Sequence, residues 1–491
     1  MLACAALSTL SCGSKTGLRV PRIDASTDTP FDVQPDVPTT MPSYLGTEFW
    51  AVSTSNAFLA RNYPFHFAVA LGNPGDSIVD VTVTGGDLTA PRTNRIAPHQ
   101  TITVQLPWVE QLSMRTNANM QCSGIVDTPP DIASARRVDG AYRVVSSAPI
   151  NAYQFNPLEF TVGTSGCTAH SYTNDASLLL PTQAIGTDYL VLAYDGTGPT
   201  FVAVAGTQEE PTTVTIVPRA AISGSTLVPS SPAGQMRTFT LARGEVVQLI
   251  ANDDLTGSEI HASAPIAVFA GNNCTNVSGD NNFQGACDHL EEQLFPQDAW
   301  GNEVVVTQLQ DRTPTERYMV RILSASDGNQ LTFTPETGVH PPAVLSRGEA
   351  MEFESAADFT VRGTGPILVA QFMEGQETTG PGFDVGDPAM VLEVPERQYR
   401  RDYSFVIPAT YTSNFVQVTA HADAMILLDG TPFTPTRTQI TGSPWTVLRQ
   451  RIAPGSHTLV TTDPAGIGLK VVGVAQYTSY MYPGGLDLSR Q

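Results

Sequence analysis

Short runs of alternating apolar and polar residues fill most of the chain from residue 44 onward, with turn residues between them. Four such runs, similar to one another, are FHFAVAL (65–71), TFVAVAGT (200–207), YMVRILSA (318–325) and NFVQVTAH (414–421). Successive side chains of a β-strand point to opposite faces, so a period of two is typical of half-buried strands. The chain is rich in Thr, Val, Gly and Pro. These features predict an all-β fold built from short strands and turns.

Two longer phrases recur along the chain and indicate internal repeats. The first reads SSAPINAYQF (146–155), ASAPIAVFAG (262–271), GTGPILVAQF (363–372) and GIGLKVVGVAQY (466–477). The second places an aspartate before a proline, with Asp175, Asp288 and Asp387 at equivalent positions. The neighbouring titratable residues His289, Glu291 and Glu292 have no counterparts in the other copies, and only the aspartate recurs there. We therefore interpret this aspartate as structural, with a carboxylate that accepts backbone N–H groups in a bend.

The repeats predict four tandem β-sandwich-like units of about 90–115 residues each, the size of one small sandwich. Their predicted ranges are 44–170, 171–286, 287–385 and 386–491. In the alternative architecture, the four units are arranged around an axis like the blades of a propeller.

The first 43 residues predict export and tethering. Residues 1–12 form a short apolar run that ends at Cys12, which resembles the end of a bacterial lipoprotein signal with Cys12 as the lipidated residue. An ordinary secretory segment or a frayed apolar N-terminus is the alternative. Residues 13–43 are rich in Pro, Thr, Asp and Ser, and such a segment reads as a disordered tether. We therefore expect an outer-membrane or cell-surface lipoprotein, or a secreted protein.

Four cysteines remain after the signal region, namely Cys122, Cys167, Cys274 and Cys287. They allow three pairings, and proximity along the chain favours Cys122–Cys167 and Cys274–Cys287. Zinc is the competing interpretation, but no Cys-x-x-Cys or His-x-x-x-His spacing accompanies them. Disulfides would agree with export, since they persist outside the reducing cytoplasm.

The charge balance argues against two classes of partner. Arginine and lysine number 26 and the acidic residues 47, which gives 26 − 47 = −21. Nucleic acid and anionic lipid both repel such a surface. No stretch approaches the roughly 20 apolar residues that a transmembrane helix needs. Membrane association is therefore expected only through a lipid on Cys12.

Candidate catalytic and metal-binding residues have structural explanations as well. Residues 75–78 (GDSI) resemble the nucleophile block of one lipase class but lie in turn-forming sequence, and no later Asp-x-x-His follows. In residues 287–292 (CDHLEE), His289 and Glu292 are candidate metal ligands. Acid-rich loops make Asp280, Asp384 and Asp387 weak calcium candidates, although no loop has the EF-hand register. No cofactor other than calcium is expected.

Five segments resemble the IgGFc-binding protein N-terminal domain family, over residues 44–486. They are SYTNDASLLLPTQAIGTDY (171–189), SAPIAVFAGNNCTNV (263–277), CDHLEEQLFPQDAWG (287–301), GDPAMVLEVPERQY (386–399) and YTSYMYPGG (477–485). Animal members are secreted, mucus-associated proteins named for binding the Fc part of immunoglobulin, and members with a lipoprotein start look bacterial. The resemblance implies a disulfide between Cys274 and Cys287 and supplies no catalytic residue.

Together these features predict a non-enzymatic binding or adhesion protein that recognises an extracellular protein or glycan. Several similar units on one chain favour avidity over a single pocket. A structural component of an extracellular matrix or surface layer is the alternative hypothesis. A hydrolase is the remote one.

Overall fold

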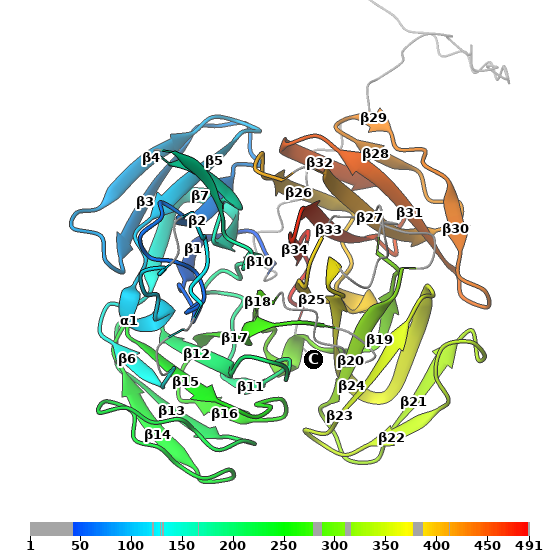
Figure 1. Ribbon diagram of the computed structural model, residues 1–491. Helices are drawn as coiled ribbons and strands as arrows, with labels where there is room; N and C mark the ends of the chain where they lie inside the picture. Colours follow the sequence, from blue (N-terminus) through cyan, green and yellow to red (C-terminus); the bar gives the residue numbers. More distant parts are fainter. Residues whose placement is uncertain are drawn as a thin grey trace, which may run out of the picture. The chain divides into compact units, whose positions relative to one another are not determined.

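The alternating runs form antiparallel strands in the computed structural model (Figure 1). The structure describes residues 43–489 except 120–121, 128, 130–131, 165, 278–286, 310–315, 377–385 and 412. Within these residues the helices are single turns, namely α1 (Glu110–Ser113), η1 (Gln297–Ala299) and η3 (Glu396–Gln398). The predicted all-β fold is confirmed.

The described strands form four groups, here called the first to the fourth group. The first contains β1 (Gly46–Ala51), β2 (Phe67–Gly72), β3 (Val79–Gly85), β4 (Arg92–Ile96), β5 (Thr101–Leu106), β7 (Tyr142–Asn156) and β10 (Asp175–Leu178). The second contains β6 (Ala135–Arg137), β11 (Asp188–Leu190), β12 (Thr200–Gly206), β13 (Thr212–Val217), β14 (Arg237–Leu241), β15 (Val246–Ala251), β16 (Glu259–Ala262), β17 (Ile266–Thr275) and β18 (Asp288–Gln293).

The other two groups follow the same plan. The third contains β19 (Gly301–Val306), β20 (Tyr318–Ser324), β21 (Asn329–Thr334), β22 (Ala343–Leu345), β23 (Ala350–Ser355), β24 (Phe359–Met373) and β25 (Met390–Leu392). The fourth contains β26 (Asp402–Ile407), β27 (Ser413–His421), β28 (Ile426–Leu428), β29 (Thr431–Pro432), β30 (Arg437–Gln439), β31 (Trp445–Ile452), β32 (Gly455–Thr461), β33 (Gly468–Ala475) and β34 (Thr478–Pro483). A separate hairpin joins β8 (Thr161–Thr164) to β9 (Cys167–His170).

Each group has two sheet portions, and the recurring Pro-Ile phrase or its equivalent connects them. The first half of β7 pairs with β1 and β3, and its second half pairs with β2 and β10. Strand β24 pairs in the same way with β19 and β21, and then with β20 and β25. In the second and fourth groups the two portions are separate sheets, linked by β16–β17 and β32–β33.

The innermost strands β10, β18, β25 and β34 meet at a common centre, here called the axis (Figure 1). Strands β10 and β25 each contact both β18 and β34 there. This placement of the groups around an axis corresponds to the propeller-like alternative, while the two sheet portions of each group are sandwich-like. The predicted second, third and fourth units begin at residues 171, 287 and 386. The first strand after each of these residues, namely β10, β18 and β25, pairs with a strand of the preceding group, namely β7, β17 and β24. The division into domains stays a prediction.

One apolar cluster runs through the groups and joins them. It extends from Tyr44 to Leu488 and includes strand residues of every group. A second cluster in the third group includes Val472, Val474 and Met481 of the fourth. The two ends of the described chain also pair, since the Tyr44 N–H donates to the Leu486 carbonyl at 3.0 Å. Residues 40–491 accordingly form one compact unit.

Candidate functional site

Asp175 connects three of the innermost strands at the axis. Its Oδ1 accepts the N–H of Ala176 at 2.9 Å, and its Oδ2 accepts the N–H groups of Glu291 and Met390 at 3.1 Å each. The first donor belongs to β10, the second to β18 and the third to β25. The side chain is fully buried, and burial raises its pKa well above the usual range. One carboxyl group thus binds the backbone of three groups.

The other two repeated aspartates lie near the same point and also hold backbone. Asp288 Oδ1 accepts the N–H of Asn174 at 2.9 Å, and Asp387 Oδ1 accepts the N–H of Gln376 at 3.1 Å. Both side chains are buried. Burial raises the pKa of Asp288 well above its usual range, and the nearby Asp387 and Asp175 add to the effect. Two of the three bonds to Asp175 and the bond to Asp288 cross between groups, which the sequence could not indicate.

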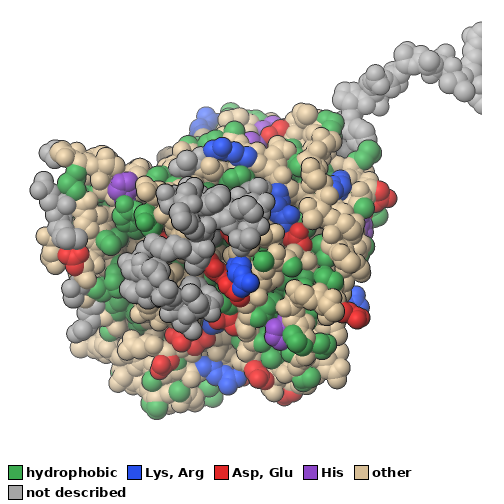
Figure 2. Space-filling view, turned by 45° about the vertical axis from the view of Figure 1, so that its right-hand side comes forward, with side chains coloured by type: hydrophobic (Ala, Val, Ile, Leu, Met, Phe, Trp, Pro, Cys, Tyr) green, Lys and Arg blue, Asp and Glu red, His purple; other side chains and the backbone are tan. Residues whose placement is uncertain are grey.

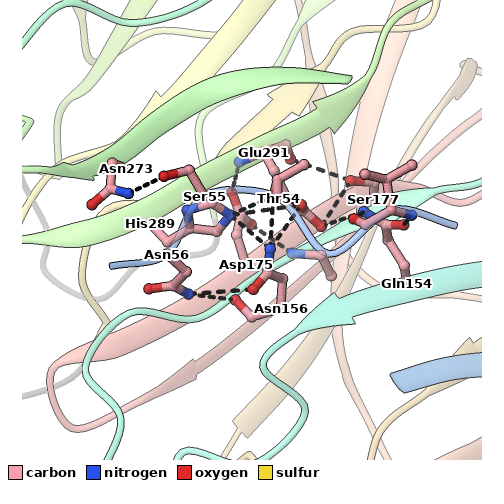
Figure 3. A network of polar contacts seen from close by, with 12 residues as sticks. Thr54, Ser55, Asn56, Gln154, Asn156, Asp175, Ser177, Asn273, His289 and Glu291 are labelled. Carbon is pink, nitrogen blue, oxygen red and sulfur yellow. Dashed lines mark hydrogen bonds and ion pairs between the residues drawn. The ribbon is translucent and has the colours of Figure 1, made fainter. Parts of the chain in front are cut away.

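Glu291 is the centre of a buried polar network between the first and second groups (Figure 3). Its carboxylate accepts hydrogen bonds from Thr54 Oγ1 at 2.6 Å, Gln154 Nε2 at 2.8 Å and Asn156 Nδ2 at 3.1 Å. The residues of this network come from the segment after β1, from β7 and from β18. All four side chains are fully buried. Charge-assisted bonds of this kind offset the cost of burying a carboxylate.

His289 belongs to the same network and is not accessible to a ligand. Its Nε2 lies 3.2 Å from Thr54 Oγ1 and 3.1 Å from Asn156 Nδ2, and its ring stacks on Phe201 with centroids 5.6 Å apart. Glu292 is fully buried too, and burial raises its pKa well above the usual range. In the part of the chain that the structure describes, no group of three or more His, Cys, Asp or Glu residues is placed to hold a metal ion.

The calcium and lipidation candidates have different outcomes. Asp280, Asp384 and Cys12 lie outside the described residues. Asp387 is described, and its carboxylate holds backbone beneath the surface as stated above. A calcium ion at these loops stays a prediction.

Both expected disulfides are present. Cys122 pairs with Cys167, with Cα atoms 5.9 Å apart, and Cys274 pairs with Cys287, with Cα atoms 5.2 Å apart. Cys167 is the first residue of β9, and Cys287 directly precedes β18. The competing zinc interpretation of these cysteines is therefore wrong. Each disulfide holds a segment that leads into an innermost strand.

Three aromatic rings gather where such segments of the first and fourth groups meet. We call this site, formed by residues 166–174 and 475–478, the loop end. The rings of His170 and Tyr172 stack with centroids 5.2 Å apart, and the Tyr477 ring meets Tyr172 edge-on at 5.9 Å. All three side chains are half-buried. Thr478 Oγ1 donates to Asn174 Oδ1 at 3.1 Å and ties the two segments together.

The backbone of the loop end is held in an uncommon conformation. Tyr172 has φ = 50° and Tyr477 has φ = 52°, in the left-handed region that bulky side chains rarely adopt. A conformation of this kind costs about 1–3 kcal/mol and persists where the surrounding structure enforces it. Around Tyr477, the N–H of this residue donates to Gln376 Oε1 at 2.8 Å, and Gln476 bridges to Gly386. Such strain is concentrated at functional sites in proteins.

A cleft of about 530 Å³ lies on another part of the surface, between the third and fourth groups. Its polar lining includes Asn302, Glu303, Glu396 and Arg397. Trp445 lies buried at the cleft and donates from Nε1 to Glu396 Oε1 at 3.1 Å. Burial, with the charge of Glu303, raises the pKa of Glu396. This cleft can accept hydrogen bonds from a polar ligand, but it holds no left-handed aromatic residues.

The lipase-like residues 75–78 lie on an exposed turn. Asp76 Oδ1 is 2.8 Å from His99 Nε2, and the two side chains are 83% and 54% exposed. Water screens an ion pair of this kind, which contributes little to stability. The structure thus places the pair on the open surface and does not shield it from water.

Uncharged side chains cover most of the face shown in Figure 2, and charged ones lie scattered among them. None of the described helices is long and apolar enough to cross a membrane.

Fold and site together define an all-β, disulfide-bonded protein whose half-exposed aromatic residues gather where loops from different groups meet. The model of the IgGFc binding protein family matches residues 175–473, and the chain belongs to this family. A human relative, the IgGFc-binding protein, is 32% identical over 200 residues, which is 40% of this chain and 3% of the relative. The chain therefore corresponds to a small part of that protein.

Proposed function

We propose that this chain is an exported, non-enzymatic protein that binds an extracellular protein or glycan through its loop end. The observation that carries the proposal is the cluster of His170, Tyr172 and Tyr477, in which two tyrosines are held at positive φ. Tyrosine offers a large apolar ring and a hydroxyl group at a low entropic cost, and it is enriched where proteins bind ligands.

The position of the cluster supports a role in binding. Loops on a rigid β scaffold are common binding sites because the scaffold fixes their geometry. Here the Cys122–Cys167 disulfide restrains the segment before His170, and β34 continues directly from Tyr477. The three repeated aspartates are buried and accept backbone N–H groups, and Glu291 and His289 are bonded to neighbouring polar side chains. These titratable residues therefore support the fold rather than a reaction.

Export is supported by two independent features. Two disulfides are present, and disulfides persist in oxidising compartments. The human relative is named for binding IgG Fc, which is an extracellular protein. A lipid at Cys12, as proposed from the sequence, would tether the binding unit to a membrane surface.

The test uses the immobilised full chain against a glycan array and a panel of extracellular proteins that includes human IgG Fc. The double variant Tyr172→Gly, Tyr477→Gly removes both rings, and glycine keeps the left-handed backbone at no steric cost. We expect it to weaken binding of the ligand found by at least about tenfold, as loss of a binding hot spot does. Tyr63→Gly, at a half-buried tyrosine outside the loop end, is the matched control.

Two outcomes would contradict the proposal. One is a ligand that the double variant binds as tightly as the wild type. The other is a chain that binds nothing on either panel and assembles into large oligomers as its concentration rises, which would support the matrix or surface-layer hypothesis.

A further inference from the structure

Lys470 lies inside the protein, although lysine is normally a surface residue. It is one of two lysines in the chain, the other being Lys15, and it is only 5% exposed. Its Nζ, on β33 of the fourth group, lies 2.5 Å from Glu393 Oε1 and donates to Gln371 Oε1. Gln371 lies on β24 of the third group, and Glu393 directly follows β25. An amine, an amide and a carboxyl group from two groups therefore meet in the core.

The amide of Gln371 is held in place from its other side. Its Nε2 donates to the Thr307 carbonyl at 2.9 Å, so its carbonyl oxygen is turned toward Lys470. Gln371 is fully buried. The bond fixes the orientation of the amide, and a fixed orientation lowers the entropic cost of a reaction between neighbouring groups.

A small cavity of about 20 Å³ adjoins these side chains, lined by Glu393, Lys470, Thr307 and Gln417 among others. A volume of about 10–15 Å³ is enough for one water molecule, so an ammonia molecule also fits. Gln417 pairs with Lys470 across β27 and β33. Its Nε2 is buried and has no hydrogen-bond partner among the described residues, which leaves two N–H donors unused beside the cavity.

Burial shifts the pKa values of the pair toward each other. It lowers the pKa of Lys470 and raises the pKa of Glu393, because a low-dielectric site disfavours both charges. The opposite charge of the partner counteracts each shift. The neutral form of the pair, with an uncharged amine and a protonated carboxyl group, becomes accessible in this way.

We propose that Lys470 and Gln371 are the two halves of an intramolecular isopeptide bond that forms after folding. Glu393 takes a proton from the Lys470 ammonium group, and the free amine attacks Gln371 Cδ. A C–N bond forms while the carbonyl electron pair moves onto Oε1. Glu393 returns its proton to Gln371 Nε2 and then takes the second proton from the Lys470 nitrogen. The electron pair on Oε1 re-forms the carbonyl as the C–Nε2 bond breaks, and ammonia leaves with the bonding pair. No oxidant or cofactor is required.

The bond would provide a covalent tie where the chain has none. Every cysteine lies at or before residue 287, so disulfides can stabilise only the first and second groups. A Lys470–Gln371 bond joins β24 to β33 and closes a loop across the third and fourth groups. Such a closure restricts the unfolded chain in the same way as a disulfide, and reducing agents do not break it.

Intact mass and proteolysis of the full chain test the proposal directly. After reduction, the wild-type protein is expected to be lighter than its sequence mass by one ammonia molecule. The denatured chain offers a lysine-specific endopeptidase two sites, Lys15 and Lys470. Acylation of Lys470 should block the second cut and leave residues 16–491 as one fragment. Trypsin, which also cuts after the arginines between the two residues, should then release a branched peptide in which the Gln371 segment is joined to the Lys470 segment.

Two variants separate the reaction from other causes of ammonia loss. Lys470→Met removes the nucleophile, and Glu393→Gln removes the proton carrier while keeping a similar shape. Both are expected to show the full sequence mass, and Glu393→Gln should be cut after Lys470. A folded wild type with the full sequence mass, cleaved after Lys470, would overturn the proposal and leave an ordinary buried ion pair. So would a mass deficit that persists in Lys470→Met. If either variant fails to fold, the branched wild-type peptide decides alone.

Discussion

Replacing Asp175 by alanine should destabilise the whole compact unit. The change removes the acceptor of three backbone N–H groups, those of Ala176, Glu291 and Met390, in a place without solvent. Each buried donor left without an acceptor costs about 1–3 kcal/mol. Part of this loss is offset, because the alanine variant no longer has the unfavourable free energy of burying the Asp175 carboxyl group, which the raised pKa reflects. We expect the free energy of unfolding to fall by roughly 3–6 kcal/mol.

That loss is large beside the roughly 5–15 kcal/mol that stabilises a typical protein. Urea unfolding followed by tryptophan fluorescence measures it, with Asp80→Ala as the control. Asp80 pairs with Arg95 at an exposed position, 68% and 71% open to solvent, so its loss should change stability by less than about 0.5 kcal/mol. The reasoning is refuted if Asp175→Ala unfolds within about 1 kcal/mol of the control.

Two further predictions concern pH and the disulfides. Burial raises the pKa of Asp288 in the folded protein above its unfolded value of about 4. The protonated Asp288 therefore contributes its full stabilisation below about pH 4, and this contribution declines as the pH rises toward the folded pKa. Asp288→Asn should therefore flatten the decline in unfolding free energy between acidic and neutral pH; an unchanged slope would contradict this. Opening Cys274–Cys287 with serine pairs should cost about 3 kcal/mol and opening Cys122–Cys167 about 4 kcal/mol, because the second loop is longer. Thermal unfolding with and without reductant measures both, and equal melting temperatures for wild type and variants would exclude the effect.

Local patterns in the sequence predicted the features that depend on local geometry. The alternation in segments such as residues 65–71 gave the strands, because strand faces alternate with a period of two. Proximity along the chain favoured both disulfides, which span 13 and 45 residues. The repeated aspartates could be interpreted as structural because the titratable residues beside Asp288 do not recur in the other copies, and in the structure each aspartate accepts a backbone N–H group.

Contacts between distant segments could not be predicted in the same way. The two N–H groups that Asp175 binds on β18 and β25 are 116 and 215 residues away. Nothing local to Tyr172 or Tyr477 places their rings together, and positive φ at tyrosine has no sequence signature. Residues 288–293 (DHLEEQ) carry polar side chains on both faces, a pattern typical of an exposed strand. In the structure all six residues are buried. Only the packing of several groups around one axis explains that burial.

Hydrogen exchange of the full chain, with and without the ligand found on the panels, tests the central claim most directly. Binding at the loop end predicts slower exchange in residues 166–174 and 475–478. Exchange should remain unchanged in β13 and β14, which lie at the outer side of the second group (Figure 1). Protection confined to the cleft around Glu303 and Arg397, with none at the loop end, would contradict the account.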